Sequence, residues 1–73
     1  ADVPKDPATL YALAGSLAAR ATDSNFDRVC KYLSRIPPEF SVLTVTMAVR
    51  RDKTLVNTAT FARWTVEHQN VLF

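Results

Sequence analysis

The stretch SNFDRVCKYLSRI, residues 24–36, decides the fold class of this chain. Its apolar residues recur every three or four positions and so share one helical face: Phe26, Val29, Cys30, Leu33 and Ile36. Its polar face carries Asp27, Arg28, Lys31, Ser34 and Arg35. Ser24 precedes Asp27 by three residues, an arrangement related to a capping box, and Pro37-Pro38 stops the pattern. The pattern predicts an amphipathic helix over residues 24–36.

A second amphipathic helix is predicted upstream, over residues 7–21. Asp6 is suited to the N-cap, and Pro7 to the first helical position, where its missing N–H costs nothing. The apolar face of this helix consists of Leu10, Leu13, Ala14, Leu17 and Ala18. Gly15 weakens the helix by up to about 1 kcal/mol relative to alanine. We interpret residues 1–5 as a tether.

Residues 40–50 combine features of a strand and of a helix. Val42, Thr44 and Thr46 are β-branched and alternate with other residues as in a strand. Helix is favoured because Pro38 suits a helix start and Arg50-Arg51 suit a helix C-terminus. An isolated strand would also leave its backbone groups without partners.

A fourth helix is predicted over residues 58–70, after a polar connection at 52–57 that Leu55 and Val56 anchor. Thr58 is suited to its N-cap. Its inner face consists of Phe61, Trp64, Thr65 and His68. The sequence therefore predicts an all-α domain over residues 6–73, with four short amphipathic helices in a compact bundle or a right-angled array.

The bulk properties limit the possible classes of protein. A chain of 73 residues has room for one core, and we expect it to gain stability by docking against a larger partner. The net charge of +2 does not by itself indicate nucleic acid. A single cysteine cannot form an internal disulfide, which favours a cytoplasmic setting, and no stretch of 18 apolar residues is available to span a membrane. Because the chain starts with Ala1, we expect it to be a fragment of a longer protein.

The sequence contains no recognisable catalytic or metal site. A phosphate-binding loop needs several glycines, whereas the chain has only Gly15. Cys30 and His68 fall short of a four-ligand zinc set, and Cys30 on an apolar stripe is better explained as a small core residue. Asp23 and Asp27 lie near a predicted helix start, where negatively charged side chains interact favourably with the positive end of the helix dipole. We therefore predict that the chain is not an enzyme by itself and carries no metal or cofactor.

Basic residues raise the alternative of DNA binding. Arg50, Arg51 and Lys53 place three cations within four positions. Arg63 is a fourth candidate, if folding brings it near them. These side chains are candidates for contacts with DNA phosphates. Cations at a helix end also interact favourably with the helix dipole, so a purely structural role stands beside this one.

Residues 24–40, SNFDRVCKYLSRIPPEF, resemble the helical C-terminal part of bacteriophage and bacterial ATPases of the AAA+ superfamily. The similarity continues through AVRRD at 48–52 and TATFARW at 58–64 to Phe73. In that superfamily a helical lid packs on the domain that binds ATP and Mg²⁺.

The resemblance implies a non-catalytic accessory domain of an ATP-driven machine. Its partners would be a neighbouring ATPase domain or the subunits of an oligomer. An arginine near the start of a lid helix can contact the nucleotide phosphates in that superfamily, and Arg28 is the matching residue. The other interpretation of Arg28 is a solvent-facing residue of its helix.

A third possibility is a free-standing protein-interaction module. Val71, Leu72 and Phe73 form an apolar C-terminal end that must be buried against the core or a partner. These three residues are the candidates for partner binding.

Overall fold

The structure, a computed structural model, describes residues 3–72 and the side chains of residues 3–70. Its elements are α1 (Pro7–Arg20), α2 (Phe26–Leu33), α3 (Pro38–Arg51), a 3-10 helix η1 (Lys53–Asn57), α4 (Ala59–Glu67) and α5 (Gln69–Leu72). No strand occurs among the described residues. The predicted all-α fold is confirmed.

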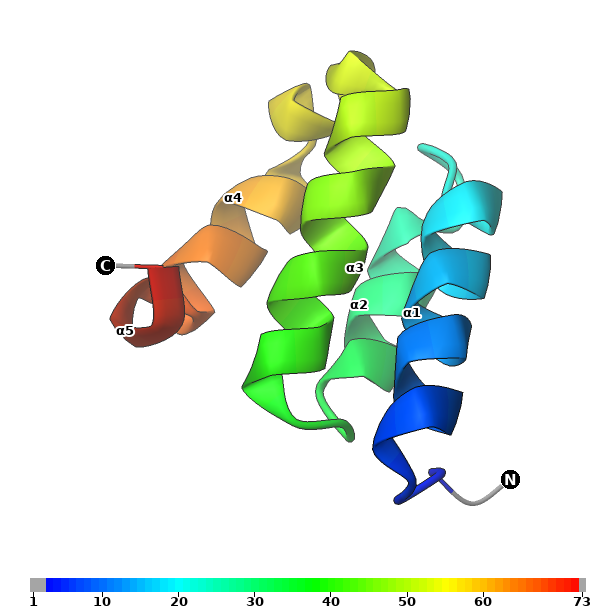
Figure 1. The fold of residues 1–73 in the computed structure, drawn as a ribbon. Helices are drawn as coiled ribbons and strands as arrows, with labels where there is room; N and C mark the ends of the chain where they lie inside the picture. The colour runs from blue at the N-terminus through cyan, green and yellow to red at the C-terminus, as the bar shows by residue number, and fades with distance from the viewer. Residues whose placement is uncertain (1–2, 73) are drawn as a thin grey trace.

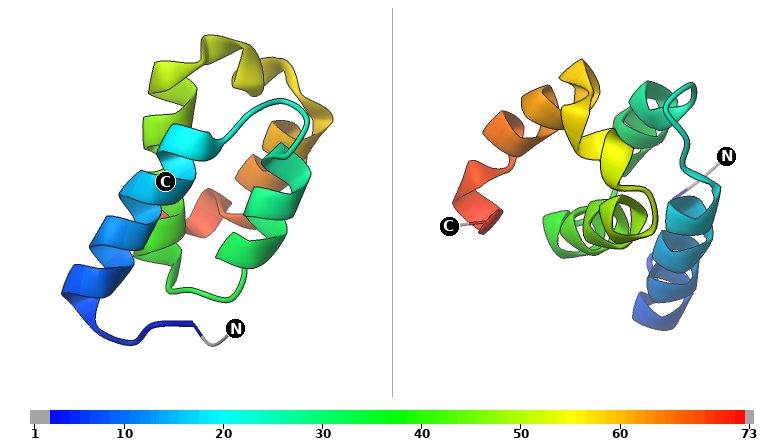
Figure 2. Two further views of the ribbon diagram at one scale, coloured as in Figure 1. Left: turned by 90° about the vertical axis from the view of Figure 1, so that its right-hand side faces the viewer. Right: turned by 90° about the horizontal axis from the view of Figure 1, so that it is seen from above.

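The helices α1 and α3 run side by side in the same direction, so their C-terminal ends lie at the same end of the molecule (Figure 1). The helix α2 runs in the opposite direction, and α4 with α5 packs on the other side of α3 from α1. The view from above places α1 and the α4–α5 segment at opposite sides of the molecule (Figure 2). The arrangement leaves α2 beside α4, where a groove forms between them.

The core draws on every element from α1 to α4. Its buried apolar residues are Leu10, Ala18, Ala21, Phe26, Leu33, Ile36, Val45, Ala48, Leu55 and Trp64. Complete burial of Phe26 or Leu33 contributes about 1.5–3 kcal/mol each. Both side chains belong to α2, so the core fixes the orientation of that helix and thereby of its outward face.

The start of α1 follows the prediction, whereas the start of α2 does not. Asp6 accepts hydrogen bonds from the backbone N–H of Thr9 at 2.9 Å and from its hydroxyl at 3.0 Å. The predicted cap at Ser24 is wrong, because α2 begins two residues later, at Phe26, without a side-chain cap. Asn25 instead accepts from the N–H of Thr22 at 2.7 Å and so closes the turn before the helix.

The predicted end of α2 at Ile36 is also wrong. After Leu33 the backbone turns tightly, with bonds from the N–H of Arg35 to Tyr32 and from the N–H of Ile36 to the carbonyl of Leu33. Pro37 has no N–H to donate to the carbonyl of Leu33, so a helix continuing past this carbonyl would leave it unpaired. Ser41 then donates to the carbonyl of Leu33 at 2.8 Å, within the core.

The prediction of helix for residues 40–50 is confirmed. The β-branched Thr44 is fully buried, and its hydroxyl donates to the carbonyl of Phe40 at 2.8 Å. This bond within the helix satisfies a polar group that would otherwise be unpaired in the core. Burial of one face of α3 by α1 thus outweighs the intrinsic β-propensity of the segment.

The C-terminal third differs from the prediction in two places. The connection at 52–57 forms the 3-10 helix η1, which buries Leu55 completely but leaves Val56 exposed. The predicted helix over 58–70 is divided at His68 into α4 and α5, while Thr58 caps α4 by accepting from the N–H of Phe61 at 3.1 Å. The predicted tether at residues 1–5 begins outside the described residues, and Val3 packs against the core.

Candidate functional site

The outward face of α2 carries a group of exposed cations around one aromatic ring. Arg28, Lys31 and Arg35 are exposed, Tyr32 is partly buried, and the four side chains line a shallow groove of about 250 Å³. We call these four residues the α2 basic face. Arg28, Lys31 and Tyr32 share one side of α2 through their three- and four-residue spacing, and Arg35 joins them from the turn that follows Leu33. The α2 basic face therefore follows from the same pattern that buries the opposite side of α2.

Arg28 lies in the first turn of α2, as the resemblance requires of a phosphate-contacting arginine. Neither Arg28 nor Arg35 forms an ion pair within the described part of the chain. The two guanidinium groups thus keep their donors available for an external anion.

Lys31 takes part in an ion pair that leaves it accessible. Its Nζ lies 3.2 Å from Oδ2 of Asp27, and the Lys31 side chain remains 76% exposed. Asp27 also accepts from Arg63 on α4, through a pair of 2.5 Å. One carboxylate is thus shared by two cations, and the α2 basic face keeps a positive surplus.

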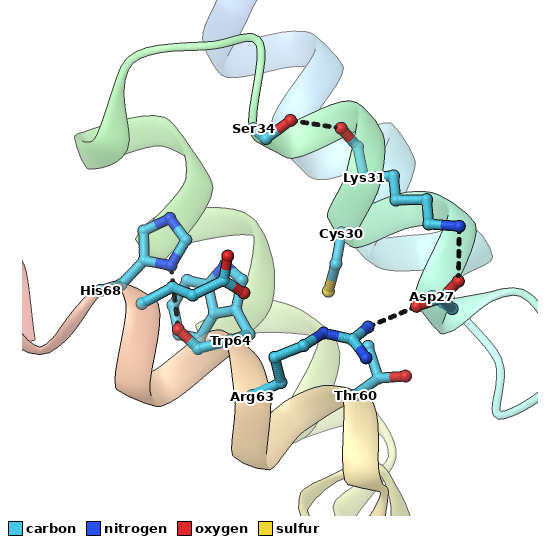
Figure 3. Close-up of a pocket in the computed structure, with 9 residues that line it drawn as sticks. Asp27, Cys30, Lys31, Ser34, Thr60, Arg63, Trp64 and His68 are labelled. Carbon is cyan, nitrogen blue, oxygen red and sulfur yellow. Dashed lines mark hydrogen bonds and ion pairs between the residues drawn. The ribbon is translucent and has the colours of Figure 1, made fainter.

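A second concavity, the α2–α4 groove, lies on the adjoining side of α2 and has a volume of about 340 Å³ (Figure 3). It is lined by Asp27, Cys30, Lys31, Ser34, Thr60, Arg63, Trp64, Glu67 and His68. Asp27 and Arg63 point toward each other from the two helices and close one side of the groove. The hydrogen bonds from Lys31 and from Arg63 lower the pKa of Asp27 below its ordinary range.

Cys30 faces the α2–α4 groove rather than the interior of the core. The prediction of a small core residue is therefore correct only in part, because the side chain is half-buried. Burial raises the pKa of its thiol to about 11, and the negative charge of Asp27 acts in the same direction. Since a thiolate is the reactive form of cysteine, this environment makes Cys30 a poor nucleophile.

An aromatic stack forms the floor of the α2–α4 groove. Trp64 is 4% exposed, and the ring of His68 stacks on it with centroids 4.5 Å apart. Nδ1 of His68 lies 2.9 Å from the carbonyl oxygen of Trp64. Because backbone and indole hold the imidazole, the arrangement stabilises the junction of α4 and α5 and offers no base to Cys30.

The four basic residues predicted to contact DNA have different surroundings in the structure. Arg51 donates from Nε to the carbonyl of Ala18 at 3.1 Å and from a terminal nitrogen to that of Ala21. Arg63 pairs with Asp27 in the α2–α4 groove. Arg50 and Lys53 are exposed at the end of α3 and the start of η1. Two of the four candidates are thus engaged in contacts within the chain.

Arg51 caps the C-terminal end of α1. The helix α1 ends at Arg20 and is followed by Ala21, which has an extended backbone with φ −67° and ψ 129°, so no left-handed residue closes its last carbonyls. Arg51 supplies donors to two of these carbonyls, and the amide of Asn25 donates to that of Arg20 at 2.9 Å. The cation also lies at the negative end of the α1 dipole.

The apolar end predicted to bind a partner lies at the edge of what the structure describes. Val71 and Leu72 belong to α5, but their side chains are outside the described residues, as is Phe73 altogether.

Comparison with protein-family models, with curated proteins and with solved structures finds no match to this chain. Among the described residues, no three potential metal-ligating side chains come together, and none of the helices has the length and apolar character needed to cross a membrane.

Sequence reasoning named Arg28, Lys31 and Arg35 as polar-face residues but did not identify them as one site. The available signal was their spacing of three, four and seven positions, with Tyr32 between them. Arg50, Arg51 and Lys53 are crowded along the chain, but adjacent positions on a helix point in different directions.

Proposed function

We propose that this chain is a non-catalytic helical domain that binds phosphate groups through the α2 basic face. One observation carries the proposal: Arg28 on α2 and Arg35 in the turn after it are exposed along one groove, and neither has an acidic partner among the described residues. Guanidinium groups match the geometry of phosphate oxygens and are less strongly hydrated than ammonium groups. Such a face favours a phosphate group over a neutral ligand.

The biological setting that we propose comes from the resemblance of residues 24–73 to the lid of AAA+ ATPases. In this setting the domain serves a cytoplasmic, ATP-driven phage or bacterial machine, and Arg28 contacts the phosphates of a nucleotide bound by a neighbouring domain or subunit. A helical domain whose position depends on such a contact would transmit the state of the nucleotide as a rigid-body movement. The chain itself supplies no hydrolytic chemistry.

The proposal is tested by titrating the isotopically labelled chain with inorganic pyrophosphate and with Mg-ATP while recording amide chemical shifts. We expect changes at Arg28, Lys31 and Arg35, and their loss in an Arg28→Ala/Arg35→Ala variant. Arg50→Ala/Lys53→Ala removes the same charge from the end of α3 and serves as the matched control. Changes confined to α3 and η1, or no changes with either ligand, would contradict the proposal.

The coupling role has its own test in a protein that joins this domain to an ATPase domain. There, Arg28→Ala should lower ATP turnover while leaving the helical content unchanged. Unchanged turnover would remove the nucleotide-sensing role without affecting phosphate binding by the isolated chain.

DNA binding through Arg50, Arg51, Lys53 and Arg63 remains a prediction without a specific observation in its favour, because Arg51 and Arg63 already have partners within the chain. Partner binding through Val71, Leu72 and Phe73 also remains a prediction.

A further inference from the structure

The α2 basic face is longer than a single phosphate group. Arg28 lies in the first turn of α2, and Arg35 lies in the turn after its last residue, Leu33; the helical part from Arg28 to Leu33 alone rises by about 7.5 Å at 1.5 Å per residue. Lys31 lies between them on the same groove. A ligand with one phosphate would leave at least one of these cations unused, whereas a chain of phosphates would engage all three.

Tyr32 adds an aromatic surface in the middle of this row of cations. One side of its side chain packs against the core, while another part lines the groove of the α2 basic face. Packing holds the ring in a fixed position, so a planar group can stack on it at little entropic cost. Aromatic rings beside a basic groove bind the bases of single-stranded nucleic acids, because every base has a face that can stack.

The charge balance of the face favours a polyanion. Asp27 is the acidic side chain paired with Lys31, and Arg63 approaches the same carboxylate from α4. The second cation leaves Lys31 only partly neutralised, and its side chain remains largely exposed. The three cations of the face can therefore all turn toward a ligand.

From these observations we infer that the α2 basic face binds single-stranded nucleic acid, with the backbone along Arg28, Lys31 and Arg35 and one base stacked on Tyr32. This inference rests on the phosphate-binding function proposed above and names the ligand class. Single strands fit better than a duplex, since only an unpaired base can turn its face toward Tyr32.

The test measures fluorescence anisotropy of labelled oligothymidylates of increasing length, from two to sixteen nucleotides, between 50 and 200 mM salt. We expect the affinity to rise with length until the row of cations is filled. The logarithmic salt dependence should have a slope of about −2, since each phosphate contact of a single strand contributes roughly −0.7. Arg28→Ala and Arg35→Ala should each reduce this slope by about 0.7.

Tyr32→Leu separates stacking from charge. This variant should weaken binding on the order of 10-fold at every salt concentration without changing the slope. Tyr32→Phe keeps both the ring and its packing and should bind as the parent does, and circular dichroism of each variant reports whether α2 is intact. Arg50→Ala/Lys53→Ala is the control for general loss of positive charge and should leave the binding unchanged.

The outcomes distinguish this inference from the proposed function. If pyrophosphate perturbs α2 but oligothymidylate binds no better than thymidine monophosphate, phosphate binding stands and the single-strand inference fails. The inference also fails if a duplex of the same length binds more tightly than the single strand, or if the α3 control weakens binding as much as Arg28→Ala. If none of these ligands perturbs α2, both proposals fail.

Discussion

Arg51 and Arg28 are both exposed arginines near the end of a helix, yet they serve the molecule in different ways. Arg51 reaches back to the carbonyls of Ala18 and Ala21 and closes the end of α1. Arg28 lies beside Arg35 and Lys31 with no internal partner among the described residues. The difference shows that a cluster of cations in the sequence indicates a ligand site only once the cations that bind carboxylates or carbonyls of the same chain have been excluded.

The α2–α4 groove, where Arg63 pairs with Asp27, also makes Cys30 a reporter of that ion pair. Burial raises the pKa of the Cys30 thiol from its ordinary value of 9.0 to about 11, so at pH 8 the thiolate fraction falls about 100-fold. We expect iodoacetamide to modify the native chain more slowly than the urea-unfolded chain, because the thiolate is the reactive form.

Arg63→Gln tests the pairing of Arg63 with Asp27 through the pH midpoint of Cys30 alkylation rather than through its rate. The positive charge of Arg63 lowers the pKa of Cys30, so its removal should shift the midpoint upward. A downward shift would mean that the groove is open and that Arg63 is not held beside Asp27.

Removal of Arg51 should have the largest effect on stability among the cations. Arg51→Ala leaves the carbonyls of Ala18 and Ala21 without their donors, and we expect a loss of about 1–2 kcal/mol in the free energy of unfolding. Urea denaturation followed by circular dichroism measures it. Arg50→Ala, at the neighbouring exposed position, should change the stability by less than about 0.5 kcal/mol. Equal effects of the two variants would contradict the assigned role of Arg51.

Gly15→Ala tests the packing between α1 and α3. A methyl group at this position would meet the Cε atom of Met47 at 3.8 Å, which is an ordinary contact, and the backbone of Gly15 is helical. We expect a gain of about 0.5–1 kcal/mol, because alanine has the higher helix propensity. A loss of stability in the same urea experiment would show that α1 and α3 pack more closely than described.

Asp27 makes the ion pairs with Lys31 and Arg63 depend on pH. Its lowered pKa means that the ion pairs stabilise the fold above the ordinary carboxyl range, and that this contribution is lost as the pH falls through the folded-state pKa, below 3.8. Asp27→Asn should therefore flatten the acid side of the stability profile. Part of the slope should remain, because hydrogen bonds from Thr54 also lower the pKa of Asp52. High salt should mimic the variant by screening the exposed pairs.

The smallest expected effect on stability belongs to the α2 basic face itself. Arg28→Ala/Arg35→Ala should change the free energy of unfolding by less than about 0.5 kcal/mol, since neither side chain has an ion pair in the described chain. A clear loss of stability would mean that these arginines, like Arg51, are engaged in the fold.

Local patterns were sufficient to predict four helical segments, because the periodicity of the apolar residues and the caps at Asp6 and Thr58 act over a few positions. Contacts between residues far apart in the sequence determine the details that those patterns do not predict. The cap of α1 comes from Arg51, 33 positions after Ala18, and no spacing rule joins two residues so far apart. The break at His68 accompanies its stacking on Trp64.

The candidate site was less predictable than the fold for the same reason. The spacing of Arg28, Lys31 and Arg35 was visible, but their availability depended on which cations the rest of the molecule engages. Arg63 and Arg51 have partners within the chain, Asp27 and the carbonyls of Ala18 and Ala21, that become neighbours only in three dimensions.

The capping of α1 by Arg51 has a consequence for how the chain folds. The donors for Ala18 and Ala21 come from 33 and 30 positions downstream, so the last turn of α1 cannot be completed until α3 has formed and docked. A peptide that stops before α3 would leave these carbonyls to water and should fray at that end. The two longest helices thus reach full stability together, which makes folding of the small domain cooperative across most of its length.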